Sequence, residues 1–522
     1  MDPQTSRLVL CAVACAVLCA APAPALAGDL LSVDGPRVTR IDDPFVPDRI
    51  DSDLGREPSV PLTRSTPRAG AARSAGRGSA RSRAAARRRK GPTRGQKAVS
   101  LALRRALAAG RITRADFNRY RRLVTRSRAT RKKLRGARGR ELGSVIATVE
   151  AIALRRQLVG SRMRPLFLIL RRNLEYWPRR TFPANRGRVS FRGSELVFEY
   201  YRGSGLQLQP LVNFTKANLL HAACVKPTYE TCSRDRLRRL LREMTATSSV
   251  RGGFRAWEYF FTFGGGRPPW ISGMAQATGI QAFARAWQLL RDPSFLVTAR
   301  EGFTAFQRPP ATGVAARGPF GGTHYLQYSF APRLFIINAF VQALIGLHDY
   351  ATITGDTTAR RLFAVAEPEA RLEVPQNDTG DWSTYSFRGR ESTAEYHELL
   401  RELLSSLCDR VRVPVYCTTA RNFRRYTTEP AQLALLGPGT VVKDQATLVR
   451  FSVSKLSAVQ LTITLNGSTA LDKVITFRRG SGSFAWTPKA AGTYSVRLAS
   501  KELRTGRGLR TLVSGAILSL PQ

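Results

Sequence analysis

Two short stretches of the chain place tyrosines beside a histidine, a pairing that general acid–base chemistry uses. HYLQYSFAPRLF (residues 324–335) and STAEYHELL (residues 392–400) contain two of the four histidines of the sequence. A tyrosine hydroxyl, with an ordinary pKa of about 10, can transfer a proton when neighbouring charges assist, and histidine titrates near neutral pH. Most tyrosines are core or rim residues, however. Two interpretations therefore stand side by side, ordinary packing or the acid and base of an active site.

Four sequence blocks around these tyrosines resemble the C-terminal domain of the D-glucuronyl C5-epimerases. The blocks occur in the same order and at similar separations as in that family, and the likeness covers about residues 205–425. They are PWISGMAQATGIQAFARAWQLLRD (269–292), YSFAPRLFIINAFVQALIGLHDY (328–350), NDTGDWSTYSF (377–387) and STAEYH (392–397).

The resemblance implies an enzyme that acts on uronic acids within heparan- or heparosan-type polymers. Matched by motif, the catalytic tyrosines of the family fall on Tyr328, Tyr385 and Tyr396. Tyr396 is the first choice for the proton-transfer group, and His397 follows it directly. The family has a Glu before the first tyrosine, where this chain has Gln327. An amide cannot take a proton from carbon, so this difference bears on the chemistry more than on the fold.

Inversion at C5 of a uronate makes demands that can be stated for any enzyme. One group must remove the weakly acidic C5 proton and another must return a proton to the opposite face of the ring. Cationic or hydrogen-bonding groups must stabilise the charge that develops on the carboxylate. We expect Gln327, His397 and Tyr325 to contact the substrate. Three arginines could hold the carboxylate, and the sequence does not choose among them: Arg388, Arg390 and Arg192.

Two other functions use the same parts. A tyrosine or histidine that removes the C5 proton can also start β-elimination, as in uronate lyases with α/α toroids, and the loss of the Glu favours this slightly. Alternatively, Gln327 marks a disarmed site in a non-catalytic protein that binds polysaccharide. A glycoside hydrolase would need a suitable pair of carboxylates. The acidic residues near the tyrosines are too loosely spaced to select one. No cofactor or metal is expected, since no nucleotide loop, zincin helix or nucleophile elbow occurs.

The elements that must position these residues are mostly helical. Apolar residues recur at three- and four-residue spacing between about residues 97 and 158, with a break at Gly110 and a restart capped by Thr113. We expect a helical hairpin and a short β region in residues 96–204. In residues 205–432, two long helices are each followed by a break and a second helix. The breaks are Asp292-Pro293 and Gly355-Asp356. Such pairs favour a mainly α fold, an α/α toroid.

The last part of the chain has a different pattern. From residue 438 to residue 522, short alternating runs are separated by Gly, Ser, Asn and Pro. This is typical of a small β-sandwich that resembles immunoglobulin-like modules. We expect its Trp486 in the core.

The N-terminal residues predict export. Arg7 precedes an apolar run, and Ala25 and Ala27 supply small residues before a cleavage point, so residues 1–27 read as a signal peptide. Residues 28–95 read as a disordered Arg/Pro-rich linker. The protein is therefore expected to be secreted, extracytoplasmic or at the cell surface.

The net charge of +46 is concentrated near the N-terminus, and residues 58–115 contain no acidic residue. Residues 58–140 could tether the chain to an acidic polysaccharide or another anionic cell-surface polymer. Alternatively, the arginines only keep a linker solvated. Export makes nucleic acid the least favoured polyanion, so no nucleic-acid partner is expected. A homodimer stays open.

Cysteine usage agrees with export. Three of the seven cysteines lie in the signal peptide, which leaves two close pairs, Cys224 with Cys232 and Cys408 with Cys417. Neither pair has the spacing of a zinc site, and its ligands would have to come from distant segments. The spacing favours two local disulfides.

Overall fold

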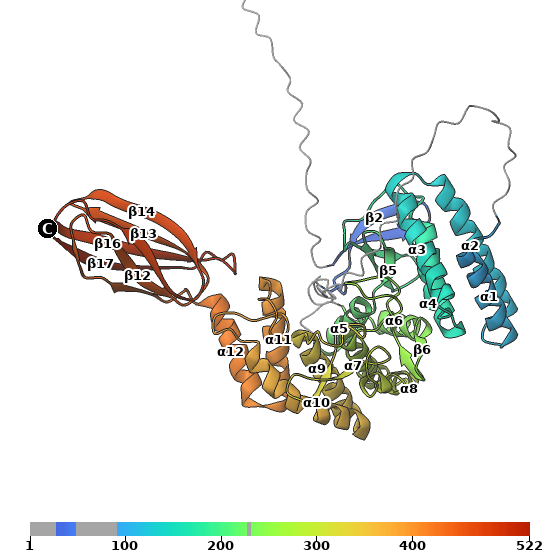
Figure 1. Cartoon of the computed structure of the whole chain (residues 1–522). Helices are drawn as coiled ribbons and strands as arrows, with labels where there is room; N and C mark the ends of the chain where they lie inside the picture. The colour runs from blue at the N-terminus through green and yellow to red at the C-terminus, as the bar shows by residue number, and fades with distance from the viewer. Residues whose placement is uncertain (1–27, 48–90, 227–230) are drawn as a thin grey trace, which may run out of the picture.

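The computed structural model describes residues 28–47, 91–226 and 231–522. The predicted signal peptide lies outside the described residues, as do residues 48–90 of the predicted linker. Figure 1 shows four N-terminal helices at one end, a central helical region, and strands at the C-terminal end. The described residues contain many helices and many strands, so the fold is mixed α and β rather than mainly α as predicted.

The N-terminal helices are more numerous than the predicted hairpin. They are α1 (Arg94–Ala108), α2 (Arg114–Lys133), α3 (Gly136–Leu154) and α4 (Gly160–Tyr176). The predicted cap is confirmed, because the Thr113 hydroxyl accepts the Asp116 N–H at 3.0 Å and the Asp116 side chain accepts in return from the Thr113 N–H. The sequence pattern did not predict α4, which contains Pro165.

A five-stranded sheet follows these helices, in the order β2-β1-β3-β4-β5. Its strands are β1 (Asp29–Asp34), β2 (Arg37–Asp42), β3 (Arg188–Phe191), β4 (Val197–Tyr201) and β5 (Gly205–Leu208). The linker prediction is therefore wrong for residues 28–47. Leu30 and Val33 of β1 are buried, and Leu31 of β1 pairs with Val189 of β3 in parallel. A partner more than 150 residues away leaves no local signal in so short a strand.

The central region contains eight helices among its described residues. They are α5 (Pro210–Val225), α6 (Arg234–Ala246), α7 (Gly273–Leu290), α8 (Ser294–Arg300), α9 (Ile337–Thr354), α10 (Thr357–Gln376), α11 (Ala394–Val411) and α12 (Pro414–Thr428). Short elements join them: β6 (Ser249–Arg251), β7 (Phe254–Ala256), the 3₁₀ helix η2 (Phe303–Phe306), β8 (Ala315–Arg317) and β9 (Thr323–Tyr325).

The two predicted helix breaks are confirmed. Helix α7 ends before Asp292, and α9 ends at Gly355, whose φ of 74° is the left-handed conformation that glycine adopts easily. Asp356 then caps α10, since its carboxylate accepts the N–H groups of Thr358 and Ala359 at 2.9 and 3.0 Å. Helix α7 packs against α5 and α9, and α9 also packs against α10 and α11. Closure of these helices into a toroid stays a prediction.

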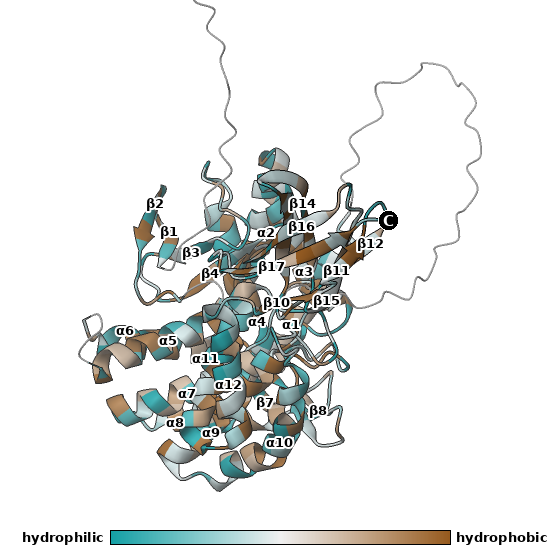
Figure 2. Cartoon of the chain, turned by 90° about the vertical axis from the view of Figure 1, so that its left-hand side faces the viewer, coloured by the Kyte–Doolittle hydropathy of each residue, from teal (hydrophilic) through white to brown (hydrophobic). Residues whose placement is uncertain are grey.

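The C-terminal strands form two sheets, one in the order β10-β12-β15 and one in the order β11-β17-β16-β13-β14. Both sheets contribute to one apolar core, and the predicted burial of Trp486 is confirmed. Figure 2 shows brown apolar residues interleaved with teal polar ones along this part of the chain. The immunoglobulin-like topology stays a prediction. The strands are β10 (Leu433–Gly437), β11 (Thr440–Val442), β12 (Thr447–Val453), β13 (Ser457–Leu465), β14 (Ser468–Phe477), β15 (Gly480–Trp486), β16 (Gly492–Glu502) and β17 (Arg510–Leu520).

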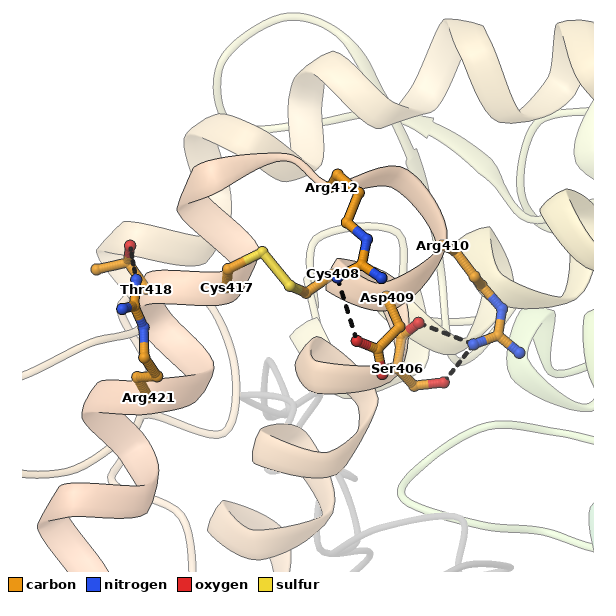
Figure 3. Close-up of a disulfide and its surroundings, with 8 residues drawn as sticks. All are labelled: Ser406, Cys408, Asp409, Arg410, Arg412, Cys417, Thr418 and Arg421. Carbon is orange, nitrogen blue, oxygen red and sulfur yellow. Dashed lines mark hydrogen bonds and ion pairs between the residues drawn. A yellow bond between two sulfur atoms is a disulfide. The ribbon is translucent and has the colours of Figure 1, made fainter.

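Both predicted disulfides are confirmed. Cys224 joins Cys232 and Cys408 joins Cys417, with Cα–Cα distances of 4.5 and 5.0 Å. The second bond ties the end of α11 to the start of α12, as Figure 3 shows. Within the described part of the chain, no helix is both long and apolar enough to cross a membrane.

Candidate functional site

Tyr328 lies in an aromatic cluster at the centre of the molecule. Its side chain is buried, and its ring centroid lies 5.8 Å from that of Phe263, 5.8 Å from that of Trp270 and 5.2 Å from that of Phe330. The same cluster includes Tyr201, the last residue of strand β4. Tyr328 therefore sits where the N-terminal sheet meets the helical region.

Tyr385 lies between the aromatic cluster and Tyr396. The Tyr385 side chain is half-buried and packs against the cluster that contains Tyr328. On its other side, the rings of Tyr385 and Tyr396 meet edge to face, with centroids 5.1 Å apart. Tyr396 is itself buried in the first turn of α11. Tyr385 thus touches Tyr396 directly and also packs against the cluster in which Tyr328 lies.

The loop that carries Tyr385 is anchored on both sides. The Tyr385 N–H donates to the Arg390 carbonyl at 2.9 Å, which closes a turn over Arg388. The Phe387 N–H donates to the Phe335 carbonyl at 2.9 Å, within the sequence block that begins at Tyr328. Arg388 is exposed at the tip of this turn, with its guanidinium 5.2 Å from the centroid of the Phe387 ring. Its positive charge is therefore available beside Tyr385.

Gln327 is buried next to Tyr328. Its side-chain carbonyl accepts a hydrogen bond from the Ser272 hydroxyl at 3.2 Å, and Ser272 in turn caps α7 through the Ala275 N–H at 3.1 Å. The residue that differs from the family is thus held at the N-terminus of a long helix.

His397 points into the protein, away from solvent. Its Nδ1 lies 2.8 Å from the Ser383 hydroxyl and its Nε2 lies 3.0 Å from the Phe423 carbonyl, so Nε2 carries the proton and Nδ1 accepts. The ring stacks on Trp382, with centroids 3.8 Å apart. Burial lowers the pKa of His397 to about 4. Both nitrogens are engaged within the protein, which leaves none for the substrate contact expected from the sequence.

Two other expected substrate contacts lie outside this region. The Tyr325 hydroxyl is buried and donates to the Leu362 carbonyl at 2.6 Å, in the core beneath α10. Burial raises the pKa of Tyr325. Arg192 lies beyond β3 on the N-terminal sheet and pairs with Asp34 at 2.7 Å. The structure groups neither residue with the three tyrosines, so these two expectations are corrected.

The N-terminal sheet adds polar residues that sequence reasoning missed. Arg186 and Glu199 form an ion pair that is largely shielded from solvent, and the Arg186 guanidinium lies 4.7 Å from the centroid of the Tyr201 ring. Gln209 accepts from the Tyr259 hydroxyl at 3.0 Å and donates to the Tyr201 hydroxyl at 3.4 Å. The buried charge pair therefore borders the aromatic cluster.

The sequence of β4 itself contains a pattern that could have pointed to Glu199. Glu199 and Tyr201 are two residues apart in β4, so they share one face of the strand, while Phe198 and Tyr200 turn to the main core. A glutamate at an inward position of a fully buried strand is unusual, because a buried charge is costly without a partner. That glutamate therefore distinguishes this face of β4 more clearly than the aromatic residues around it do.

A second buried acid–base cluster lies in the same region, near β9. His324 Nδ1 lies 2.8 Å from a Glu373 carboxylate oxygen, and both side chains are fully buried. Burial and the nearby Glu369 raise the pKa of Glu373 to about 9, while burial lowers that of His324 to about 3. Glu369 accepts the N–H groups of Phe320 and Gly322 at 2.9 and 2.7 Å. This cluster fixes the glycine-rich loop that follows β8.

The C-terminal sheets reach the loop that carries Tyr385. Arg504 forms ion pairs with Asp381 and, at 2.6 Å, with Glu391. Its guanidinium also lies 5.5 Å from the centroid of the Trp382 ring, the ring on which His397 stacks. A single arginine of the C-terminal region thus braces both ends of this loop.

Comparison with known proteins agrees with the motif blocks. Residues 251–425 match the family model described as D-glucuronyl C5-epimerase C-terminus. A D-glucuronyl C5-epimerase of Caenorhabditis elegans is 29% identical over 133 residues, which is 23% of this chain and 22% of that protein. An uncharacterized protein of Methanocaldococcus jannaschii is 23% identical over 177 residues, 33% of this chain and 58% of that protein. The chain therefore spans less than two thirds of either relative.

Two solved structures align with part of the chain at low identity and low TM-score. A GH76 alpha-mannanase from Bacteroides thetaiotaomicron is 11% identical with a TM-score of 0.34, over 45% of this chain and 65% of that one. A cellobiose 2-epimerase from Bacillus thermoamylovorans is 10% identical with a TM-score of 0.30, over 42% of this chain and 60% of that one.

The family match contains all three tyrosines and the elements that bring them together, from the loop before α7 to α12. Residues 251–425 of the chain therefore belong to the D-glucuronyl C5-epimerase C-terminus family.

Proposed function

We propose that this protein is a carbohydrate epimerase that inverts C5 of D-glucuronyl-type uronic acid residues in an extracellular acidic polysaccharide. Family membership of residues 251–425 supports the class of reaction. The observation that carries the proposal is the grouping of the three tyrosines within that segment: Tyr385 packs against the cluster that contains Tyr328, and its ring meets that of Tyr396 edge to face. Two proton-transfer groups that serve opposite faces of one sugar must lie near each other in the fold.

In the proposed reaction one group takes the C5 proton and leaves an enolate-like carboxylate. A second group then delivers a proton to the opposite face of C5, so one C5–H bond breaks, another forms, and no glycosidic bond is cleaved. Tyr396 is the first candidate for one face, and Tyr328 or Tyr385 serves the other. Gln327 contributes a hydrogen bond to the substrate rather than a base.

Positive charge near the carboxylate is the second requirement, because it stabilises the enolate-like intermediate. Arg388 is exposed at the turn beside Tyr385. Arg186 borders the aromatic cluster from the other side and is held by Glu199. We assign the carboxylate to one of these two arginines. Substitution of each by Gln, with KM and kcat measured separately, decides between them.

A second candidate function is β-elimination, in which the C5 proton is removed and the bond to O4 breaks to give an unsaturated uronate. Gln327 favours it, since the family's second base is absent at that position. Elimination needs one base and a tyrosine that protonates the leaving oxygen.

Incubation of the full chain with uronate polymers in deuterated water distinguishes these functions. Deuterium at C5 without cleavage supports the epimerase, and ultraviolet absorbance from an unsaturated uronate supports the lyase. Neither signal, with retained binding to the polymer, supports a non-catalytic protein. Tyr325→Phe is a matched control, because it removes a buried tyrosine hydroxyl that bonds only to the Leu362 carbonyl among described groups.

The proposed place of action is outside the cytoplasm. Two disulfides within the helical region support an oxidising compartment. The signal peptide predicted in residues 1–27 agrees with an oxidising compartment outside the cytoplasm. N-terminal sequencing of the mature protein tests whether this segment is removed.

A further inference from the structure

The N-terminal helices form an open groove, lined by residues that precede the family segment in the chain. Its volume is about 660 Å³, and it lies between the exposed side of α1, the end of α3 and the start of α4. Four large apolar side chains stand exposed around it: Leu101, Leu154, Val159 and Val250. Folded soluble proteins rarely gather such residues in one place without a ligand or a partner.

The periodicity of α1 explains the groove. Its buried side carries Val99, Leu103 and Ala106, which face α3. A second stripe at Ala98, Leu101, Ala102 and Arg105 repeats at three- and four-residue spacing and lines the groove instead. Helix α1 therefore has a second stripe whose two alanines pack partly against the core, while Leu101 stays exposed in the groove.

Three arginines complete the rim of the groove. Arg105, Arg111 and Arg156 all line it and are exposed. Gly160 allows the backbone at Arg111 to approach α4, since a Cβ there would lie 2.6 Å from the Arg111 Cβ. None of the three arginines forms an ion pair with any residue that the structure describes. An apolar floor with unpaired positive charge at its edge is complementary to an anionic amphiphile.

We propose that this groove docks the protein on an anionic lipid surface, with acyl-chain carbon over the apolar floor and lipid phosphate at Arg105, Arg111 and Arg156. Apolar side chains flanked by arginines are the combination by which peripheral proteins bind such surfaces. The Arg-rich residues 58–95 are an unsuitable occupant, because they carry the same sign of charge as the rim.

The test is co-sedimentation of the full chain with vesicles of phosphatidylglycerol and phosphatidylcholine, compared with phosphatidylcholine alone. The groove variant is R105E/R111E/R156E. The control is R450E/R497E/R510E, three exposed arginines of the C-terminal sheets, which changes the net charge equally. We expect the groove variant to lose about 100-fold in partitioning onto anionic vesicles, since each arginine near such a surface contributes roughly a fivefold factor. The control should lose much less.

A second pair of variants tests the apolar floor. Leu154→Ser with Val250→Ser removes side chains that are 52% and 57% exposed. Leu448→Ser with Val474→Ser is the control, with residues 48% and 58% exposed on the C-terminal sheets. We expect the first pair to weaken partitioning by about tenfold and the second to leave it unchanged.

Three outcomes would overturn the proposal. Equal losses in the groove and control arginine variants mean that net charge alone drives binding. If neither arginine variant loses partitioning, another segment binds the vesicles, for example the Arg-rich residues 58–95. Loss in the arginine variant without loss in Leu154→Ser with Val250→Ser means a charged patch into which no acyl chain inserts. Unchanged melting temperatures check that each variant folds.

Discussion

The helical region and the C-terminal sheets bury very different residues. The helical region holds acids, histidines and an amide in its interior, among them Glu373, His324 and Gln327. The core shared by the two C-terminal sheets is aliphatic and aromatic, with residues such as Val449 and Phe451. Burying a polar group costs free energy unless it is paired, so a fold retains such groups mainly where they position or perform chemistry.

The charges buried in the C-terminal sheets lie where those sheets meet the helical region. The Lys455 ammonium donates to the Tyr426 carbonyl at 3.1 Å, at the end of α12, and Arg504 pairs with Asp381. The difference between the two regions therefore suggests a division of labour. The helical region holds the residues of the proposed reaction, and the C-terminal sheets contact it through a few charged side chains.

The largest effect is expected at Tyr396. Tyr396→Phe removes one hydroxyl and little volume, so C5 exchange should fall by about 1,000-fold, as for loss of a positioned proton-transfer group. The melting temperature should stay nearly unchanged. Deuterium incorporation at C5 and calorimetry measure the two effects.

The matched control for this experiment lies in the other region. Tyr494→Phe removes a hydroxyl that bonds the Ala490 backbone at 3.1 Å in the C-terminal sheets. It should leave C5 exchange intact. Wild-type exchange in Tyr396→Phe would show that this tyrosine only packs.

Arg504 is the residue that tests whether the two regions cooperate. Arg504→Met should destabilise the protein by about 3–5 kcal/mol, because it leaves the buried Asp381 carboxylate without its partner. It should also lower kcat, since the loop with Tyr385 loses its brace. Arg497→Met, an exposed residue on β16 just before the loop that carries Arg504, is the control. A loss of stability with unchanged kcat in the folded variant would make Arg504 purely structural.

The pH dependence of stability should reveal His397. Its folded pKa is about 4 against an ordinary 6.5, so the unfolded chain binds the proton first as the pH falls. The neutral ring therefore contributes about 3 kcal/mol to the free energy of unfolding above about pH 6.5, and this contribution is lost as the pH falls toward 4. Denaturant unfolding at several pH values measures it. His397→Gln should remove this part of the acid sensitivity, and an unchanged pH profile would contradict the assignment of His397 as a neutral, buried ring.

The smallest effect is expected at the disulfide between α11 and α12. Cys408→Ser with Cys417→Ser should lower the free energy of unfolding by about 2–3 kcal/mol, because the bond closes a short loop. The change should not alter C5 exchange in the folded protein. Thiol labelling of denatured, unreduced wild-type protein gives a direct check, and four free thiols in the mature chain would contradict both bonds.

Several features could be predicted from the sequence because they depend on close neighbours. The cap at Thr113, the break at Gly355 and the two cysteine pairs each follow from residues within about ten positions. The motif blocks likewise identified the segment that carries the tyrosines, since order and spacing along the chain are all that such a likeness needs.

The sequence alone could not show which side chains meet. Tyr396 and His397 are adjacent, yet successive residues of a helix point about 100° apart, so the first reaches Tyr385 and the second enters the core against Trp382. The same limit separates Tyr325 from Tyr328: Tyr325 bonds to α10 and Tyr328 joins the aromatic cluster.

Local sequence thus determined the helix ends, the disulfides and the family segment, because each depends on short-range geometry. Only the tertiary structure decided that β1 pairs with β3, that Arg186 and Glu199 border the tyrosines, and that Arg504 reaches their loop. These contacts join residues brought together by packing of the whole chain. Their free energy comes from burial and charge pairing between segments, which no short window of sequence contains.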